Sequence, residues 1–241
     1  MVSPEEVKRL SIRHQTAPLT IAREYAQHCF LSEFYKLKSS DRLLFKGGTA
    51  LRLIYQSPRY SEDLDFTGIN NILYPEIEAL LIETLRNLTA WGFGINITET
   101  ERTTGGYLAK MDCAFSGFKI QMKIEISFRA RKQKSRGTVS RIKNDYIPYY
   151  DIYHLSLDEI VDGKISALLT RAKARDWYDL YFFLRGRMLQ AKNTKLIPEL
   201  LEKLKKTKTN FKKELKDFLP RSHQMILKDF KSTLIEEIKR Y

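Results

Sequence analysis

The stretch FKGGTALRLIYQSPRYSEDLDF, residues Phe45 to Phe66, places two glycines and a threonine ahead of an apolar helix pattern and two aspartates after it. The apolar run before the glycines predicts a short buried strand over 43–45, and the glycine pair predicts a turn. Apolar spacing then predicts a helix from 50 to about 56, and SPRY leads back into a second strand, EDLDF. The stretch therefore predicts a strand, turn, helix, strand unit.

The two aspartates of EDLDF are expected to share one face of their strand. Residues two apart project from the same side, so Asp63 and Asp65 point together while Leu64 and Phe66 point into the core. Two close carboxylates repel each other unless a cation lies between them. Oxygen ligands suit Mg²⁺ or Mn²⁺, which also bind substrate phosphates. The pair therefore predicts a divalent metal site.

The glycine turn predicts the second half of the same site. Gly47, Gly48 and Thr49 precede a helix, so their backbone N–H groups and the positive helix end would favour a phosphate. A tight turn also needs glycine for its own geometry, which is the structural alternative. The glycine pair combined with the D-x-D strand is a more specific signal than either alone.

A third carboxylate is predicted on a later strand. Ile124 and its alternate neighbours form an apolar face, and Glu125 belongs to the polar face. Glu125 would complete a metal triad with Asp63 and Asp65, as in two-metal phosphoryl transfer. Alternatively, it faces solvent and pairs with Lys123.

Two acids and a lysine in the C-terminal third are further candidates. Lys164 lies beside an apolar stripe of its helix, where it needs an anion such as a triphosphate, although a snorkelling side chain or an ion pair would serve equally. Asp176 and Asp179 lie three apart among aromatic residues, so one of them is expected to face the site. Alternatively, Asp176 caps its helix and Asp179 pairs with Arg175 or a neighbouring base.

The rest of the chain predicts one core followed by a helical region. Capping residues and apolar spacing indicate helices over 4–14, 18–38 and 75–91. Apolar and polar residues alternate in three segments, FGINITET, YLAKMDCAF and FKIQMKIEISF, which are separated by TTGG and SG. This pattern predicts an antiparallel meander. Beyond the basic segment 129–143 the chain is expected to be helical to its end. We predict an α/β core with N-terminal helices over 1–155 and a helical domain over 156–241.

The charge balance favours an anionic partner. The 241 residues include 42 Lys and Arg against 29 Asp and Glu, a formal net charge of +13. This excess favours nucleic acid or an acidic membrane surface and disfavours a polycationic substrate, with general solubility as the alternative. Cys29 and Cys113 lack metal-ligand spacing. Charges throughout the N-terminus and the absence of a long apolar run predict a soluble cytoplasmic protein without a membrane partner.

One basic segment concentrates this charge. RARKQKSRGTVSRIK, from Arg129 to Lys143, carries seven positive residues and no acid. It would bind the phosphates of RNA, or it forms a solvated hairpin. Four nearby tyrosines could stack on bases or belong to the core: Tyr146, Tyr149, Tyr150 and Tyr153. The predicted RNA-contacting residues are Arg129, Arg131, Lys132, Lys134 and Arg136.

Four blocks in this order resemble the AbiEii/AbiGii toxin family: GGTALRLIY, RYSEDLDF, KIEIS and DGKISALLTRAKARDWYDLY. This family is a branch of the polymerase-β-like nucleotidyltransferase superfamily that includes the MenT toxins. The matching blocks run from about Phe45 to Phe183. The resemblance implies an α+β fold with a small mixed sheet flanked by helices, followed by a C-terminal helical domain.

The resemblance also implies roles for individual residues. Asp63 and Asp65 would bind Mg²⁺, Asp176 would be a further active-site acid, and Arg59 would be a loop anchor. The residues that would contact the phosphates of the nucleotide are Gly48, Thr49, Ser61 and Lys164.

The sequence therefore predicts Mg²⁺-dependent transfer of a nucleoside monophosphate from an NTP to a hydroxyl group. RNA is the expected acceptor, and the resemblance makes the acceptor end of tRNA the leading one. The chain would act as the toxin of a type IV toxin–antitoxin pair, with a cognate antitoxin as partner. The alternatives are a nucleotide- or RNA-binding module without turnover and a nucleotidyltransferase for small molecules.

Overall fold

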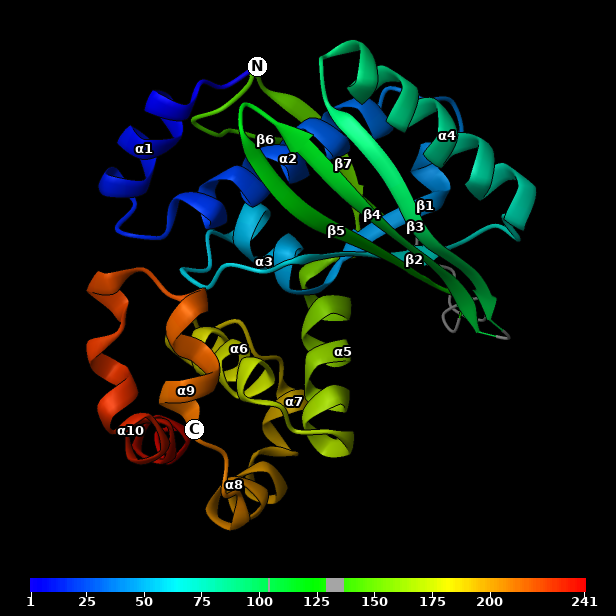
Figure 1. Cartoon of the computed structure of the whole chain (residues 1–241). Coiled ribbons are helices and arrows are strands. Elements are labelled where there is room, and N and C mark those ends of the chain that lie inside the picture. The colour runs from blue at the N-terminus through cyan, green and yellow to red at the C-terminus, as the bar shows by residue number, and fades with distance from the viewer. Residues whose placement is uncertain (104, 129–136) are drawn as a thin grey trace. The chain divides into compact units, whose positions relative to one another are not determined.

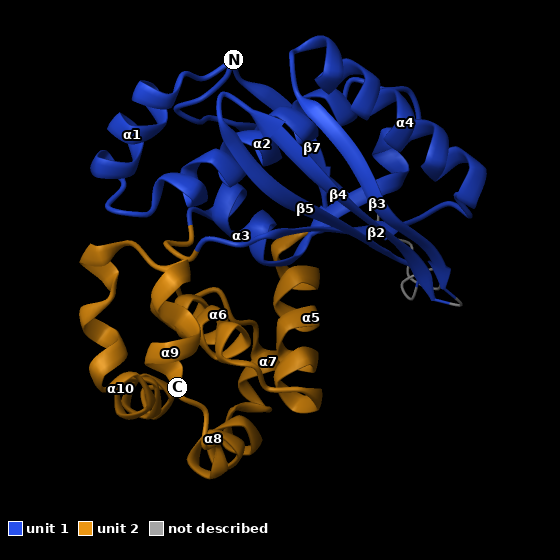
Figure 2. Ribbon diagram, viewed as in Figure 1, with its two compact units in different colours: residues 1–56, 60–155 blue, residues 57–59, 156–241 orange. Residues whose placement is uncertain are grey.

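The computed structural model describes residues 1–103, 105–128 and 137–241. The chain forms two compact units, coloured separately in Figure 2. Residues 1–56 and 60–155 form the first, which we call the sheet unit. Residues 156–241 form the second, the helical unit, together with the short segment Ser57–Arg59 from within the opening stretch.

The sheet unit is built on a seven-stranded mixed sheet in the order β3-β4-β5-β2-β1-β7-β6 (Figure 1). Strands β2 and β5 are parallel neighbours, as are β1 and β7, and the other neighbouring strands are antiparallel. The strands are β1 (Leu43–Lys46), β2 (Asp63–Gly68), β3 (Gly94–Thr103), β4 (Gly106–Phe115), β5 (Phe118–Ser127), β6 (Thr138–Ile142) and β7 (Tyr150–His154).

The helices of this unit are α1 (Pro4–Arg13), α2 (Pro18–Phe34), α3 (Gly47–Tyr55) and α4 (Tyr74–Ala90). The Ser3 side chain accepts a hydrogen bond from the Glu6 N–H, so α1 begins at the predicted cap. Apolar residues of α2 cover one face of the sheet, where the rings of Phe34 and Phe66 lie 5.4 Å apart. The opposite face of β2 and β5 therefore remains for polar side chains.

The opening stretch folds as the predicted strand, helix, strand unit, but its helix begins earlier. Helix α3 starts at Gly47 itself, so the glycine pair forms the first turn of the helix rather than a separate loop before residue 50. The helix ends at Tyr55, next to Gln56 in the left-handed conformation.

The expectation that the chain is helical beyond residue 143 was wrong. Strand β7 pairs in parallel with β1, and β6 pairs with β7 at the sheet edge. Tyr150, Ile152 and His154 are buried on alternate positions, as a strand requires. Both strands have only five residues, and the pairing of β7 with β1 joins segments about a hundred residues apart, so local patterns gave little sign of them.

The helical unit contains α5 (Leu157–Thr170), α6 (Ala174–Arg185), α7 (Ala191–Thr194), α8 (Ile197–Lys206), α9 (Phe211–Leu215) and α10 (Phe230–Ile238), with short 3₁₀ turns between α9 and α10. The predicted capping box is confirmed, because Ser156 and Glu159 bond reciprocally at the start of α5. Trp177, Phe183 and Phe230 lie in its core. The predicted α+β class, a mixed sheet flanked by helices and followed by helices, is confirmed. Within the described residues, helices long and apolar enough to cross a bilayer are absent.

Candidate active site

The two aspartates of β2 share the polar face of the sheet. Leu64 and Phe66 are fully buried on the other face, while Asp63 and Asp65 are partly exposed. The strand therefore carries two carboxylates on one side, beside α3 and within reach of solvent.

Gly47 brings one of these carboxylates close to the start of α3. A Cβ atom at this position would lie 2.0 Å from Oδ2 of Asp65, and Gly47 has φ +83°. Both observations require glycine, because a side chain would collide with the carboxylate and the backbone conformation disfavours L-residues. The Asp65 carboxylate therefore lies against the N-terminal turn of α3, where side-chain caps are absent.

Two hydrogen-bonding side chains fix the backbone that leads into β2. The Thr49 hydroxyl donates to the Asp63 carbonyl over 2.5 Å. The Gln27 amide of α2 donates to the carbonyls of Ser61 and Glu62 over 3.0 and 3.1 Å. The Thr49 hydroxyl is thus occupied within the protein, and only the backbone of Thr49 suits the predicted phosphate contact.

A buried ion pair joins α3 to α2. Arg52 Nε donates to Glu24 over 2.7 Å, and the Tyr146 hydroxyl donates to the same carboxylate over 2.9 Å. The Arg52 guanidinium also lies over the Tyr60 ring, 3.9 Å from its centroid. Burial alone would raise the pKa of Glu24, but the charge and hydrogen bond of Arg52 hold it below its usual value. This network anchors α3, and with it the glycine turn.

Strand β5 lies parallel to β2 and adds two charged side chains to the polar face. Asp63 is the register partner of Lys123, and Asp65 is the register partner of Glu125. Lys123 and Glu125 form an ion pair. Burial opposes the charge on Lys123, yet the Glu125 hydrogen bond and the charges of Asp63, Glu125 and Asp65 raise its pKa. Three carboxylates and one ammonium group therefore share this surface.

The predicted metal triad is thus only partly assembled. Asp63, Asp65 and Glu125 occupy one face of neighbouring strands. The part of the chain that the structure describes has no group of three His, Cys, Asp or Glu side chains arranged to hold a metal ion. Glu125 makes the lysine contact that was its structural alternative, and its metal role stays a prediction.

In the helical unit, Asp179 is the centre of a buried charge cluster. Arg59 donates to both of its carboxylate oxygens, over 2.9 and 3.0 Å, and Lys164 Nζ lies 2.7 Å away. Asp179 and Arg59 are almost fully buried. Burial would raise the pKa of Asp179, but the charges of Arg59 and Lys164 hold it below its usual value. Asp179 thus pairs with these two bases rather than with Arg175.

Asp176 lies beside this cluster with a partner of its own. Arg171 donates to both carboxylate oxygens of Asp176, each over 3.0 Å, and Lys164 Nζ lies 3.8 Å from it. Lys164 therefore faces two acids, which is the ion-pair alternative of the sequence analysis. The predicted contact of Lys164 with phosphates and the active-site role of Asp176 stay predictions.

The predicted RNA-contacting residues, from Arg129 to Arg136, lie outside the described residues. Two of the four tyrosines that follow bond to side chains of α2, and Tyr150 of these two is buried. Tyr146 bonds to Glu24, and the Tyr150 hydroxyl lies 2.7 Å from Nδ1 of His28. Tyr149 is 63% exposed, and its stacking on a base stays a prediction.

The charged strands, the glycine turn and the buried Lys164 cluster all lie in a region that matches a known family. Residues 29–240 match the family described as nucleotidyl transferase AbiEii toxin, type IV TA system. The chain belongs to the AbiEii family. The resemblance stated from the sequence is confirmed, and this AbiEii chain is a nucleotidyltransferase whose substrate is an NTP.

Two solved structures share the fold of this AbiEii chain. MenT4, a nucleotidyltransferase toxin from Mycobacterium tuberculosis H37Rv, is 15% identical with a TM-score of 0.70, covering 100% of this chain and 91% of that one. JHP933 from Helicobacter pylori is 19% identical with a TM-score of 0.61, covering 93% and 95%. At this identity the likeness establishes the fold alone. No curated protein sequence matches the chain.

Asp63, Asp65 and Glu125 of this AbiEii chain have the donor chemistry that suits a divalent cation. The donors are carboxylate oxygens, as Mg²⁺ and Mn²⁺ prefer. Gly47 leaves room for Asp65 against the helix start, a space that a Cβ atom would fill. Lys123 is the cationic partner of Glu125 on this surface and the register partner of Asp63.

Sequence reasoning missed three residues that shape this AbiEii site. Glu24 and Gln27 lie on α2, whose apolar spacing gave no sign that its polar residues are buried. Lys123 was considered only as a solvent-exposed partner of Glu125. The alternation of β5, with Lys123 two residues before Glu125, placed both on one face and was the available signal.

Proposed function

We propose that this AbiEii chain transfers a nucleoside monophosphate from an NTP to a hydroxyl group of RNA, with the acceptor end of tRNA as the leading acceptor. In this reaction the acceptor oxygen forms a bond to the α-phosphorus, and the proton of its hydroxyl group is released to solvent. The bond between the α-phosphorus and the bridging oxygen breaks, and pyrophosphate leaves.

The observation that carries this proposal is the placement of Asp65. Its carboxylate lies against Gly47 at the N-terminus of α3, on the same strand face as Asp63. Asp63 and Asp65 would hold the divalent cation, with Glu125 as a third candidate. When bound, such a cation supplies Lewis-acid stabilisation of the phosphoryl oxygens and the leaving group.

The chain's own groups have a simpler task, which is to bind and orient the triphosphate. The backbone N–H groups of Gly47, Gly48 and Thr49 open α3, so the positive helix end favours phosphate there. Ser61 lies two residues before Asp63, the first residue of β2, and is partly exposed, as a phosphate contact requires. Lys164 and Asp176 of the helical unit are proposed as a phosphate ligand and an active-site acid.

The charge of the chain supports RNA as the acceptor. A formal net charge of +13 favours a polyanion over the polycationic small molecules that related enzymes modify. Lys and Arg residues that neutralise RNA phosphates release counterions, so binding should weaken steeply with salt. A salt-independent affinity would contradict this part of the proposal.

The decisive experiment supplies total RNA, Mg²⁺ and each α-labelled NTP in turn to the purified protein. We expect label in one class of RNA with the wild type and none with Asp63→Ala. Equal labelling by both proteins would contradict the assignment. Label confined to small molecules would indicate the alternative acceptor class. Separating the labelled RNA by length distinguishes tRNA from other acceptors.

The roles of Lys164 and Asp176 are tested with Lys164→Gln and Asp176→Asn. Because both residues belong to buried ion pairs, circular dichroism must first show that each variant is folded. Folded variants with a raised KM for the NTP would support phosphate binding by Lys164. Unchanged kinetics in a folded variant would remove that residue from the site.

A further inference from the structure

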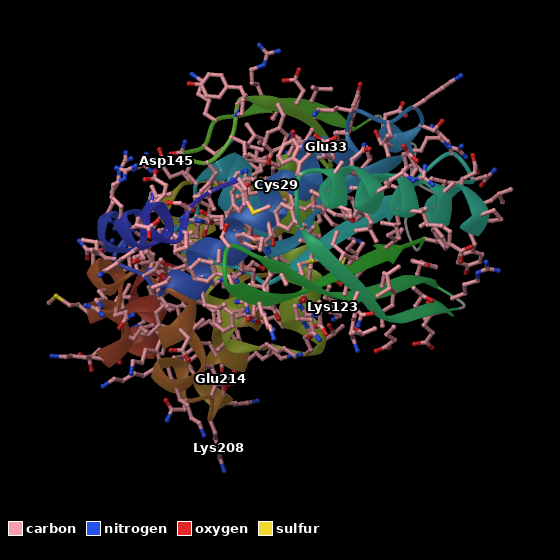
Figure 3. The ribbon with its side chains drawn as sticks, turned by 45° about the horizontal axis from the view of Figure 1, so that its top comes forward. Cys29, Glu33, Lys123, Asp145, Lys208 and Glu214 are labelled. Atoms are coloured by element: carbon pink, nitrogen blue, oxygen red, sulfur yellow. The ribbon has the colours of Figure 1, made fainter. Side chains whose placement is uncertain are left out.

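Lys123 has an unusual position for a strand lysine, because three acids surround it on the polar face of β2 and β5. It is the register partner of Asp63, and its ammonium group is paired with Glu125, the register partner of Asp65. Figure 3 shows Lys123 on the green strands of the sheet. Neighbouring strands are about 4.8 Å apart, so the stems of Lys123 and Asp63 lie side by side.

The other lysines nearby are placed differently. Lys110 is the register partner of Lys123 on β4, and its ammonium group bonds to Glu99 over 2.6 Å. Lys46 is the register partner of Asp65 on β1, on the far side of β2 from Lys123. Lys123 differs from both because it lies on β5, the strand that carries Glu125. It is paired with Glu125 and lies beside Asp63.

We propose that Lys123 is the resident counter-cation of this carboxylate surface and that it competes with the divalent metal for Asp63, Asp65 and Glu125. The inference rests on the proposed function, because it takes those acids as the metal site. In the absence of metal, the ammonium group offsets the mutual repulsion of the three carboxylates. A bound metal would repel the ammonium group, and Glu125 would have to leave Lys123 to serve as a ligand.

Lys123 therefore acts as a positioning residue that weakens metal binding and stabilises the metal-free protein. Its removal has two opposite effects. The carboxylates lose a positive neighbour, so the metal-free form becomes less stable. The metal loses a competitor, so it binds more tightly. A residue with a purely structural role would weaken both folding and metal binding.

The test is a Mn²⁺ titration of the full-length protein, followed by electron paramagnetic resonance of the free ion. We expect Lys123→Gln to lower the Mn²⁺ Kd about tenfold, because one unit charge near a divalent ion is removed. Lys123→Arg keeps the charge and should retain the wild-type Kd. Lys119→Gln is the matched control, since Lys119 lies on the same face of β5 but pairs with Ala114 of β4.

The outcomes separate this inference from the proposed function. If the wild type shows no saturable Mn²⁺ binding, or if Asp63→Asn leaves it unchanged, the proposed metal site fails and the inference fails with it. If the wild type binds Mn²⁺ through Asp63 but Lys123→Gln has an equal or higher Kd, only the inference is overturned.

Thermal unfolding gives a second readout that needs no activity. In EDTA, Lys123→Gln should have a lower Tm than the wild type, and added Mn²⁺ should raise its Tm by more. If this variant does not fold in EDTA, recovery of its circular dichroism spectrum on adding Mn²⁺ supports the inference. Failure to recover with Mn²⁺ overturns it.

Discussion

Arg59 and Asp179, 120 residues apart in sequence, form a two-bond ion pair that is buried almost completely in the helical unit. Arg59 belongs to a three-residue segment between α3 and β2, yet this segment is part of the compact unit formed by the C-terminal helices. The pair therefore joins two distant parts of the sequence within one core.

Breaking this pair should destabilise the protein strongly. Arg59→Ala leaves the Asp179 carboxylate with Lys164 as its remaining base, which should lower the free energy of unfolding by about 3 to 5 kcal/mol. Urea unfolding at neutral pH measures this. The control is Arg185→Ala, whose side chain is 57% exposed and 3.7 Å from Glu237, with an expected loss below about 1 kcal/mol. Equal losses would contradict the prediction.

Gly47→Ala should lower nucleotide transfer through a collision with Asp65, in addition to the backbone strain that lowers stability. A Cβ atom would lie 2.0 Å from Asp65 Oδ2, so the carboxylate must move and nucleotide transfer should fall at least about tenfold. Gly117→Ala is the matched control, because Gly117 has φ +80° with nothing within 4 Å of the added Cβ. Both variants should lose about 1 to 2 kcal/mol of stability from the positive φ. Transfer assays and urea unfolding separate the two effects, and equal activity in both variants would refute the role of the Asp65 contact.

Stability should fall in mildly acidic solution because of His28. Burial lowers the pKa of His28 from 6.5 to about 4. Between these values the unfolded chain binds a proton that the folded protein does not, so stability decreases as pH falls through this window. The loss should reach about 3 kcal/mol near pH 4. Urea unfolding at pH 7 and pH 4.5 should show a smaller difference for His28→Gln than for the exposed control His223→Gln. Identical pH dependence in the two variants would exclude His28 as the cause.

Thr49 should matter through its hydroxyl group rather than its volume. Thr49→Val removes the hydrogen bond to the Asp63 carbonyl and leaves this part-buried carbonyl without that donor. We expect the free energy of unfolding to fall by about 1 to 2 kcal/mol. Thr49→Ser keeps the hydroxyl and should retain most of the stability. We also expect slower transfer by Thr49→Val, because the backbone that carries Asp63 is less well held. If Ser and Val behave alike in unfolding and transfer assays, the bond has no positioning role.

The parts of the fold that local sequence specifies were predictable. Alternation placed Asp63 and Asp65 on one strand face, and the strand, helix, strand order of the opening stretch was predicted, although α3 begins at Gly47 rather than at residue 50. The antiparallel meander of β3, β4 and β5 followed from turn residues and period-two alternation. In each case the signal lies within about ten residues of the feature that it predicts.

The features that depend on distant partners were not predictable in this way. Strand β7 was missed because its parallel neighbour β1 lies about a hundred residues earlier. The partner of Asp179 was equally hidden, since Arg59 belongs to a different block of the sequence. Glu24 was missed because a charged residue on an apolar helix is expected to face solvent unless its partner, here Arg52, is known.

The segment Ser57–Arg59 has a consequence for how this protein can be divided. A cut after residue 155 yields a C-terminal fragment that lacks the Arg59 guanidinium, the buried partner of Asp179. Residues 156–241 keep Lys164 beside Asp179, but the second base, Arg59, lies outside this range. An exchange of the helical unit must therefore include Ser57–Arg59, because this unit is not one continuous stretch of the chain.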